Sequence, residues 1–152
     1  MERHVVLMNP EIHWNTGNIG RTCVGTGSHL HLIEPLGFSL SEKQVKRAGL
    51  DYWPKVKLSL WPRFETFCEA FSVDRRELCF FSKNGKQSLW ELPAAQVRLF
   101  LVFGAETKGL PAELMNEYAD LLFRIPINND IRSLNLSTSV GIALYESMRP
   151  SV

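Results

Sequence analysis

Short apolar runs rich in β-branched and aromatic residues alternate with amphipathic segments along the whole chain, and this alternation restricts the fold more than any other feature. It is the pattern of repeated strand–helix–strand units, which assemble into a largely parallel sheet with helices on both faces. We therefore predict an α/β fold. The predicted strands are residues 5–8, 30–34, 56–60, 78–82, 99–103 and 121–125, and the predicted helices are residues 17–26, 42–48, 62–71, 111–116 and 136–148.

The size and composition of the chain are those of an ordinary globular protein. With 152 residues and 45% hydrophobic content, we expect a single domain over residues 1–152. Such a chain can bury roughly 70% of its surface without a disulfide or a structural metal. Cys23, Cys68 and Cys79 form no Cys-x-x-Cys pair, which predicts free thiols and a cytoplasmic location. The longest apolar run, residues 99–103, is too short to span a membrane.

Three segments that follow predicted strands are polar and carry the candidate functional residues. They are residues 9–21, 104–110 and 126–137, which hold many amide, hydroxyl and charged side chains. In open parallel sheets, ligands bind beyond the carboxyl ends of the strands. We therefore expect these three segments to form a common site.

Common nucleotide and metal motifs are excluded or weak. Gly25-Thr-Gly27 lacks the third glycine of a dinucleotide fingerprint, because Leu30 stands in its place. Residues 104–109 have the glycine spacing of a P-loop, but a Leu-Pro pair follows where Lys and Ser or Thr are required. His29 and His31 share one face of a strand, but with no third ligand nearby we expect no metal site.

Several segments together resemble the SpoU/TrmH family of knotted RNA ribose 2′-O-methyltransferases. The three ordered motifs are residues 15–21 (NTGNIGR), residues 101–111 (LVFGAETKGLP), and the pair 124–126 (RIP) and 133–137 (SLNLS). Residues 9–11 (NPE), 32–38 (LIEPLGF) and 46–52 (KRAGLDY) are most similar to the minimal TrmL-type members, which act on the wobble nucleotide of tRNA. The chain departs from the family at Trp14, where a small residue or proline is more usual.

The resemblance implies which residues carry the reaction. It places Arg21 at the reacting ribose, with Asn15 on the same segment, and it gives Asn135 a role in catalysis or in the cofactor-binding loop. Because arginine is always protonated, Arg21 is suited to orienting the hydroxyl and a phosphate rather than to removing the proton. Asn135 opens a predicted helix, so capping that helix is its alternative role.

The resemblance also implies S-adenosyl-L-methionine as cofactor, a trefoil knot near the C-terminus and a homodimer. Gly104 would allow close backbone approach to a ligand, and Glu106 would accept hydrogen bonds or hold its loop. Phe81 would line the pocket, although a plain core position is at least equally consistent with its type. Leu136, Val140, Ala143 and Leu144 form an apolar stripe that fits either a partner surface or an internal core. The cofactor-binding residues implied by the resemblance are Phe81, Gly104, Glu106, Ile125, Ser133 and Leu134.

Charge is distributed unevenly although the net charge is only +1. Residues 43–63 hold six basic residues and one acid, and residues 104–120 hold one base and four acids. We predict that the basic segment binds the phosphates of tRNA through Lys43, Lys46 and Arg47. Ribosomal RNA as substrate, and a catalytically silent RNA-binding dimer, are the alternatives to a tRNA-modifying enzyme.

Overall fold

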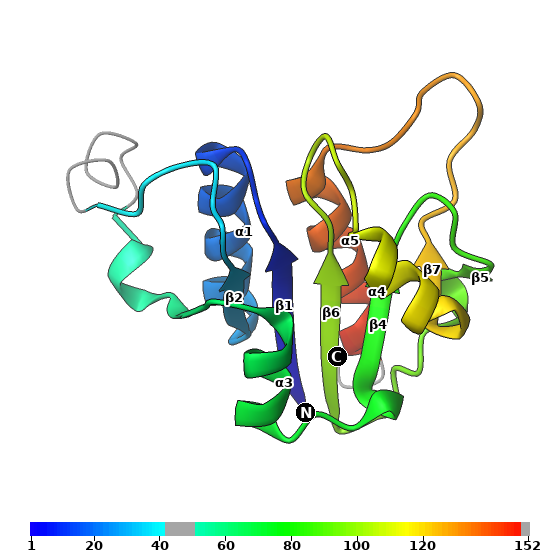
Figure 1. Ribbon diagram of the computed structural model, residues 1–152, viewed down its shortest axis with the longest axis horizontal. Helices are drawn as coiled ribbons and strands as arrows, with labels where there is room; N and C mark the ends of the chain where they lie inside the picture. Colours follow the sequence, from blue (N-terminus) through cyan, green and yellow to red (C-terminus); the bar gives the residue numbers. More distant parts are fainter. Residues whose placement is uncertain (42–50, 150–152) are drawn as a thin grey trace.

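The computed structural model describes residues 1–41 and 51–149, and these build one seven-stranded sheet (Figure 1). The spatial order is β3-β2-β1-β6-β4-β7-β5, and every neighbouring pair is parallel. This confirms the predicted parallel α/β sheet. The strands are β1 (Glu2–Met8), β2 (His29–Ile33), β3 (Lys57–Trp61), β4 (Leu78–Phe81), β5 (Gln87–Ser88), β6 (Arg98–Phe103) and β7 (Leu122–Arg124).

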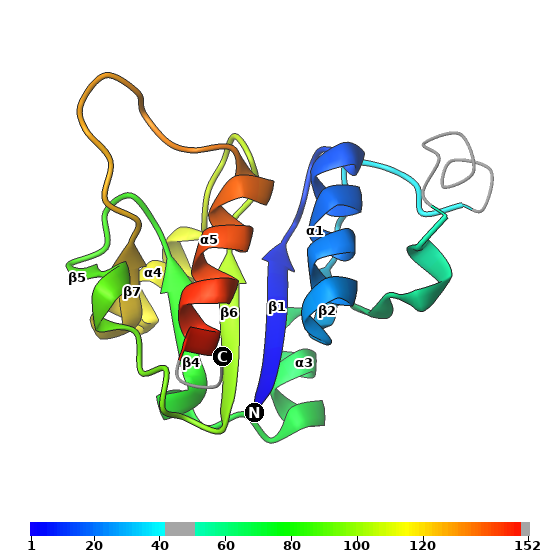
Figure 2. The same cartoon turned by 180° about the vertical axis from the view of Figure 1, so that it is seen from behind.

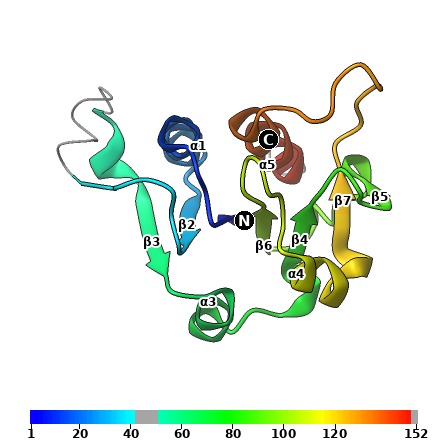
Figure 3. The ribbon, with the colours of Figure 1, turned by 45° about the horizontal axis from the view of Figure 1, so that its top comes forward.

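Helices cover both faces of the sheet. Helices α1 (His13–Thr26) and α5 (Leu136–Met148) lie on one face, and α3 (Phe64–Phe71) and α4 (Ala112–Glu117) lie on the other (Figures 2 and 3). Short 3₁₀ helices occupy Trp53–Lys55 (η1), Arg75–Glu77 (η2), Leu89–Glu91 (η3) and Ala119–Leu121 (η4). The helix predicted over residues 42–48 lies outside the described residues.

Side chains of the central strands alternate between two apolar cores. Val5 and Leu7 of β1 pack with α1 and α5, whereas Val6 and Met8 pack with α3 and α4. Successive side chains of a strand point to opposite faces, so a strand covered on both sides reads as a continuous apolar run. This explains why the sequence shows apolar runs here instead of an alternation of apolar and polar residues.

The apolar stripe of α5 belongs to the internal core. Val140, Ala143 and Leu144 are fully buried in the cluster that joins α5 to the sheet. Leu136 is partly buried against the same cluster. Of the two roles that the sequence left open for this stripe, the structure therefore shows the internal one.

Several predicted boundaries differ from the observed ones. Helix α1 begins at His13, four residues before the predicted start. Helix α3 begins at Phe64, so Pro62 precedes the helix, and Pro111 is the N-cap of α4. The segment after β4 holds strand β5 and helix η3, which the sequence did not indicate because strand β5 has only two residues.

All three cysteines are free, as the sequence predicted. Cys23 and Cys79 are fully buried in the core that lies under α1 and α5. Burial raises the pKa of each of these thiols to about 12. They therefore act as small apolar core residues and not as nucleophiles.

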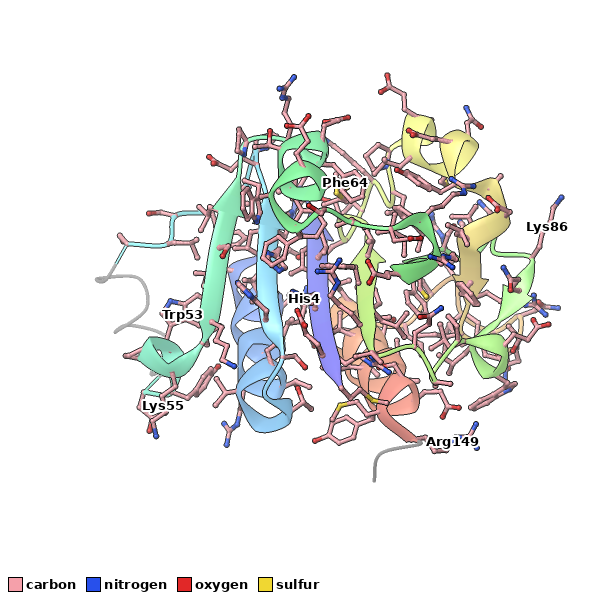
Figure 4. All side chains as sticks on the ribbon, turned by 90° about the horizontal axis from the view of Figure 1, so that it is seen from below. His4, Trp53, Lys55, Phe64, Lys86 and Arg149 are labelled. Atoms are coloured by element: carbon pink, nitrogen blue, oxygen red, sulfur yellow. The ribbon has the colours of Figure 1, made fainter. Side chains whose placement is uncertain are left out.

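Three imidazoles gather on β1 and β2, beside α3, where Figure 4 labels His4. The prediction that His29 and His31 lack a third imidazole is wrong, because His4 is brought beside them from the neighbouring strand. One ring nitrogen of each histidine lies within 4.8 Å of the others, and the three rings are stacked within 27° of parallel.

Hydrogen bonds use the ring nitrogens of this cluster. The indole N–H of Trp61 donates to Nδ1 of His31 (3.0 Å), which leaves Nε2 of His31 as the donor to Nδ1 of His4 (2.8 Å). Nε2 of His4 then donates to the Glu2 carboxylate (2.6 Å). Burial lowers the pKa of His31 to about 2, so this ring is neutral at physiological pH.

Candidate active site

A cavity of about 760 Å³ lies at the carboxyl ends of four adjacent strands, β1, β6, β4 and β7. Its walls come from the segments that follow these strands. The three polar segments singled out in the sequence, residues 9–21, 104–110 and 126–137, all contribute to it. The fold thus brings together residues that are far apart in the sequence, such as Asn15 and Asn135, which are separated by 120 positions.

Most of the predicted site residues line this cavity, and Arg21 does not. The lining includes Asn15, Phe81, Gly104, Glu106, Ile125, Ser133, Leu134 and Asn135. Arg21 lies six residues beyond Asn15 along α1, which corresponds to about 9 Å of helix rise. Lys43, Lys46 and Arg47 lie outside the described residues.

Glu106 holds the start of α1. Its half-buried carboxylate accepts hydrogen bonds from the backbone N–H groups of Glu11 and Ile12, each at 2.8 Å, and from the side-chain amide of Asn15 at 3.2 Å. Ile12 is the N-cap of α1 and has no side-chain cap of its own. A carboxylate at this end is favoured by the positive end of the helix dipole.

Asn15 connects this carboxylate to the opposite wall. Its side chain is 3% exposed, and its Oδ1 accepts a hydrogen bond from Nδ2 of Asn135 at 3.2 Å. Oδ1 of Asn135 in turn accepts from the backbone N–H of Ser137 at 2.9 Å, which caps α5. Both suggested roles of Asn135 are therefore compatible, because its side-chain oxygen caps the helix while its amide nitrogen donates to Asn15, another residue of the cavity lining.

Glu11 makes the reverse contact to the loop that carries Glu106. Its carboxylate accepts hydrogen bonds from the backbone N–H of Thr107 at 2.9 Å and from the Thr107 hydroxyl at 2.8 Å. These hydrogen bonds lower the pKa of Glu11. Two carboxylates, one on each segment, therefore fasten the segment after β1 to the loop after β6.

Gly104 is required by the chain's own backbone. A Cβ placed on this residue would lie 2.1 Å from the carbonyl carbon of Gly109, because the loop folds back on itself. Ala105 and Gly109 exchange backbone hydrogen bonds of 3.2 and 2.9 Å across this turn. The sequence suggested that Gly104 allows the backbone to approach a ligand closely. In the structure, the missing side chain first allows Gly104 to approach the backbone of its own loop.

The deeper wall of the cavity is apolar. Phe81 is stacked on Phe103 with ring centroids 4.8 Å apart and planes 9° from parallel. Ile125 and Leu134 line the cavity from the segment after β7. Phe81 is both a core residue and a lining residue, so its two suggested roles coincide. Apolar side chains of this kind suit contact with a flat heteroaromatic ring.

Arg21 lies on the exposed side of α1 beside Tyr52. Its guanidinium carbon is 5.6 Å from the centre of the Tyr52 ring, which is within range of a cation–π contact. The Tyr52 hydroxyl donates a hydrogen bond of 2.7 Å to the backbone carbonyl of Gly17, one turn before Arg21. Partial burial raises the pKa of Tyr52, so this hydroxyl stays protonated and can donate.

Sequence reasoning missed several lining residues. Ser82, Lys83 and Asn84 follow β4 and lie outside the three segments that the sequence singled out. The rule that sites lie beyond the carboxyl ends of strands would have found Ser82 to Asn84 if the position of β4 between β6 and β7 had been known. That strand order depends on long-range pairing and leaves no signal in local sequence.

Comparison with known proteins places the chain in a family. The model of the SpoU rRNA Methylase family matches residues 2–145. The chain is 43% identical over 146 residues to a tRNA (cytidine(34)-2′-O)-methyltransferase of Aeromonas hydrophila, and the match covers 95% of this chain and 92% of that protein.

Solved structures agree with this match. One, described as giving insight into 2-OH methylation of C/U34 on tRNA, has a TM-score of 0.85 at 44% identity and covers 97% of this chain and 95% of that one. The SpoU methyltransferase AviRb of Streptomyces viridochromogenes, in complex with AdoMet, shares the fold, with a TM-score of 0.82 at 20% identity over 97% of this chain and 57% of that one. The chain belongs to the SpoU methylase family.

Proposed function

We propose that this protein transfers a methyl group from S-adenosyl-L-methionine to the ribose 2′-hydroxyl of the wobble nucleotide, a cytidine or uridine at position 34 of tRNA. The observation that carries the proposal is the cavity at the carboxyl ends of four strands, where Glu106, Asn15 and Asn135 form one hydrogen-bonded chain. The high identity to relatives named for this reaction supports the substrate.

The cavity residues fit an adenosine-containing cofactor. The volume of about 760 Å³ lies in the range of cofactor sites. Phe81, Ile125 and Leu134 offer apolar contact to an adenine ring, and the backbone of Gly104 and the hydroxyl of Ser133 are polar groups of the same lining. When bound, the cofactor supplies an electrophilic methyl group on a sulfonium. Both oxygens of Glu106 already accept hydrogen bonds within the protein, so we assign this residue to holding the walls of the cavity.

Orientation of the ribose is the main chemical task for the protein. A 2′-hydroxyl is a weak nucleophile, so transfer requires it to be held close to the methyl group and in line with it. We assign Arg21 to binding the hydroxyl and the adjacent phosphate through its fork of donors, with the proton leaving to phosphate or water. Asn15 and Asn135 would keep the cofactor-binding residues in place for this step.

A homodimer would bring Arg21 of one copy to the cavity of the other copy. Within one chain Arg21 is about 9 Å of helix rise beyond Asn15, whereas a second copy could present its Arg21 from outside. Helix α5 offers a surface for such a contact, because Ile142 and Tyr145 are 38% and 57% exposed on the side that faces away from the sheet. We propose that the protein is a homodimer in which these residues lie at the interface.

The basic segment favours a small folded RNA as substrate. Lys55, Lys57 and Arg63 are exposed within the described part of that segment, and we propose that they extend the phosphate-binding surface predicted for Lys43, Lys46 and Arg47. The names of the relatives, which specify nucleotide 34 of tRNA, favour tRNA over ribosomal RNA. No helix in the described residues is long and apolar enough to cross a membrane. We propose that the protein acts in the cytoplasm, where tRNA is modified.

The test is methyl transfer from labelled cofactor to a panel of purified tRNAs, followed by nuclease digestion and mass spectrometry. We expect a 2′-O-methylated nucleoside at position 34 of at least one tRNA. We expect Arg21→Ala to reduce the rate at least 100-fold while cofactor binding is retained. Full activity of Arg21→Ala, or absence of any 2′-O-methyl mark with the wild-type protein, would contradict the proposal.

A further inference from the structure

The charged side chains that line the cavity are mostly cationic. They are Lys83 after β4, Lys108 after β6 and Arg132 after β7. Glu106 is the one acid among the described lining residues, and its carboxylate is directed to the backbone at the start of α1. The other acids that the sequence holds between residues 104 and 120 do not line the cavity. Although the segment after β6 is acidic, the cavity itself therefore has an excess of positive charge.

Lys83 lies in a tight turn that the sheet holds in place. The backbone N–H of Gly85 donates to the carbonyl of Ser82 at 3.0 Å, and the N–H of Ser82 donates to the carbonyl of Phe123 at 2.9 Å. Nη1 of Arg124 donates to the carbonyl of Gly85 at 3.2 Å. A Cβ on Gly85 would lie 2.4 Å from the carbonyl carbon of Phe123, so the turn packs closely against β7. The backbone that carries Lys83 is thus fixed beside the cavity.

Lys83 and Arg132 lack a partner among the residues that the structure describes. Both side chains are exposed, and neither makes a hydrogen bond or an ion pair there, even though Asp130 lies two residues from Arg132. Lys108 differs, because its charge helps the hydrogen bonds from Thr107 to lower the pKa of the nearby Glu11 carboxyl. Two uncompensated cations that reach one cavity from different strands favour an anionic ligand.

RNA matches this charge better than the methyl donor does. S-adenosyl-L-methionine has a single carboxylate and two positively charged groups, its sulfonium and its amino group. RNA carries a phosphate at each nucleotide, and its backbone must come to the cavity for a ribose to reach the methyl group. In the proposed homodimer, Arg21 of the other copy comes to the same cavity, so contacts from both copies act on one RNA segment.

We propose that Lys83 and Arg132 bind backbone phosphates of the RNA segment that enters the cavity. The inference rests on the proposed function and deepens it, because it concerns how the target ribose is positioned. Phosphate contacts fix the position of a nucleic acid without reading its bases. Lys83 and Arg132 are therefore positioning residues, and their contacts are equally available to a cytidine and a uridine.

The test measures how the binding of a fluorescent anticodon stem-loop depends on salt. Full-length protein is titrated without methyl donor at about 50 to 200 mM salt. The variants are Lys83→Ala, Arg132→Ala and the double variant. Lys86→Ala is the matched control, because Lys86 is exposed in the same segment as Lys83, does not line the cavity and lies at the outer edge of the molecule in Figure 4.

Loss of a phosphate contact changes both the affinity and its salt dependence. We expect each single variant to raise Kd about 2- to 10-fold. The slope of log K against log salt should become less steep by about 0.7 for each contact removed from a single-stranded loop, and by about 1.4 in the double variant. The control should leave Kd and slope unchanged. Lys83→Arg and Arg132→Lys keep the charge and should keep the slope, which separates loss of charge from loss of folding.

A second measurement shows whether the two side chains contact phosphates. Stem-loops in which one phosphate at a time is replaced by a neutral methylphosphonate are titrated against the wild type and the double variant. We expect the difference in Kd between the two proteins to shrink at one or two linkages and to persist at the others. A difference that no replaced phosphate reduces, or a double variant with the Kd and slope of the control, would overturn the inference.

Two further results would also contradict it. If the double variant loses affinity for S-adenosyl-L-methionine in calorimetry while its RNA binding is unchanged, the two cations hold the cofactor carboxylate instead. If the variants dissociate a dimer in analytical ultracentrifugation and the loss of RNA binding follows that dissociation, the two residues act on assembly.

Methyl transfer tests the proposed function separately. Binding that depends on Lys83 and Arg132, without any methyl transfer by the wild-type protein, would refute the proposed function and leave the inference standing. Methyl transfer to tRNA with the same KM in the double variant and the wild type would refute the inference and leave the proposed function standing.

Discussion

Replacing Glu106 by Gln tests whether one carboxylate fastens the two walls of the site. The carboxylate accepts three hydrogen bonds, from the N–H groups of Glu11 and Ile12 and from the amide of Asn15. A glutamine keeps one acceptor oxygen and turns its NH₂ group toward at least one N–H donor. Hydrogen bonds to charged groups contribute about 1.5–3 kcal/mol each, and solvent at this half-buried position reduces that value. We expect a loss of about 2–4 kcal/mol in unfolding free energy.

The assay is urea denaturation followed by circular dichroism, with thermal unfolding at the same protein concentration. A loss of this size lowers Tm by on the order of 10 °C for a chain of this length. Glu69→Gln on α3 is the control, because Glu69 is exposed and should change stability by less than about 0.5 kcal/mol. If Glu106→Gln is as stable as the control, the carboxylate does not hold the walls and the reasoning is refuted.

Substitutions at four further residues test other parts of the structure. Gly104→Ala should destabilise the protein by more than about 2 kcal/mol, because the added Cβ would lie 2.1 Å from a backbone atom. Gly25→Ala, where the added Cβ would lie in open space on α1, should stabilise the protein by up to about 1 kcal/mol. The denaturation midpoints of the two variants in urea check both predictions. Asn135→Ala should lose about 1 kcal/mol of unfolding free energy, because it removes the cap of α5. Asn135→Asp keeps the cap but cannot donate a hydrogen bond to Asn15. Normal cofactor affinity of Asn135→Asp, measured by calorimetry, would contradict a role for the hydrogen bond between Asn135 and Asn15. The pKa of His31 is lowered to about 2, so at mildly acidic pH the unfolded chain binds a proton that the folded chain does not. The free energy of unfolding should therefore be at its full value above about pH 6.5 and fall by about 1.4 kcal/mol per pH unit below it. His31→Gln should show a flatter pH profile of stability, and an equally steep profile would contradict this.

Local pattern predicted the elements of this fold well, because their causes are local. Six apolar runs were identified as strands, and strands β1, β2, β3, β4, β6 and β7 lie at or within a few residues of those positions. The polar segments after three of them were expected to converge, since parallel strands end at one edge of a sheet, and all three line the cavity. The knot implied by the resemblance stays a prediction.

Features that depend on which strands are neighbours could not be predicted. His4 joins His29 and His31 only because β1 pairs with β2 in a register that sets His4 opposite His29. The clash that forbids a side chain at Gly104 arises from a loop that folds back on itself. In the same way, the hydrogen bonds of Glu106 connect positions more than 90 residues apart in the sequence. Sequence types alone carried no sign of these contacts.

Methylation of the wobble ribose is tested most directly by mass spectrometry of tRNA from the native host. Anticodon-loop fragments are compared between cells with the gene, cells without it, and cells that carry only the Arg21→Ala variant. We predict a 2′-O-methyl group on nucleotide 34 of particular tRNAs that is present in the first cells and missing in the other two. Identical modification of nucleotide 34 in cells with and without the gene would contradict the account.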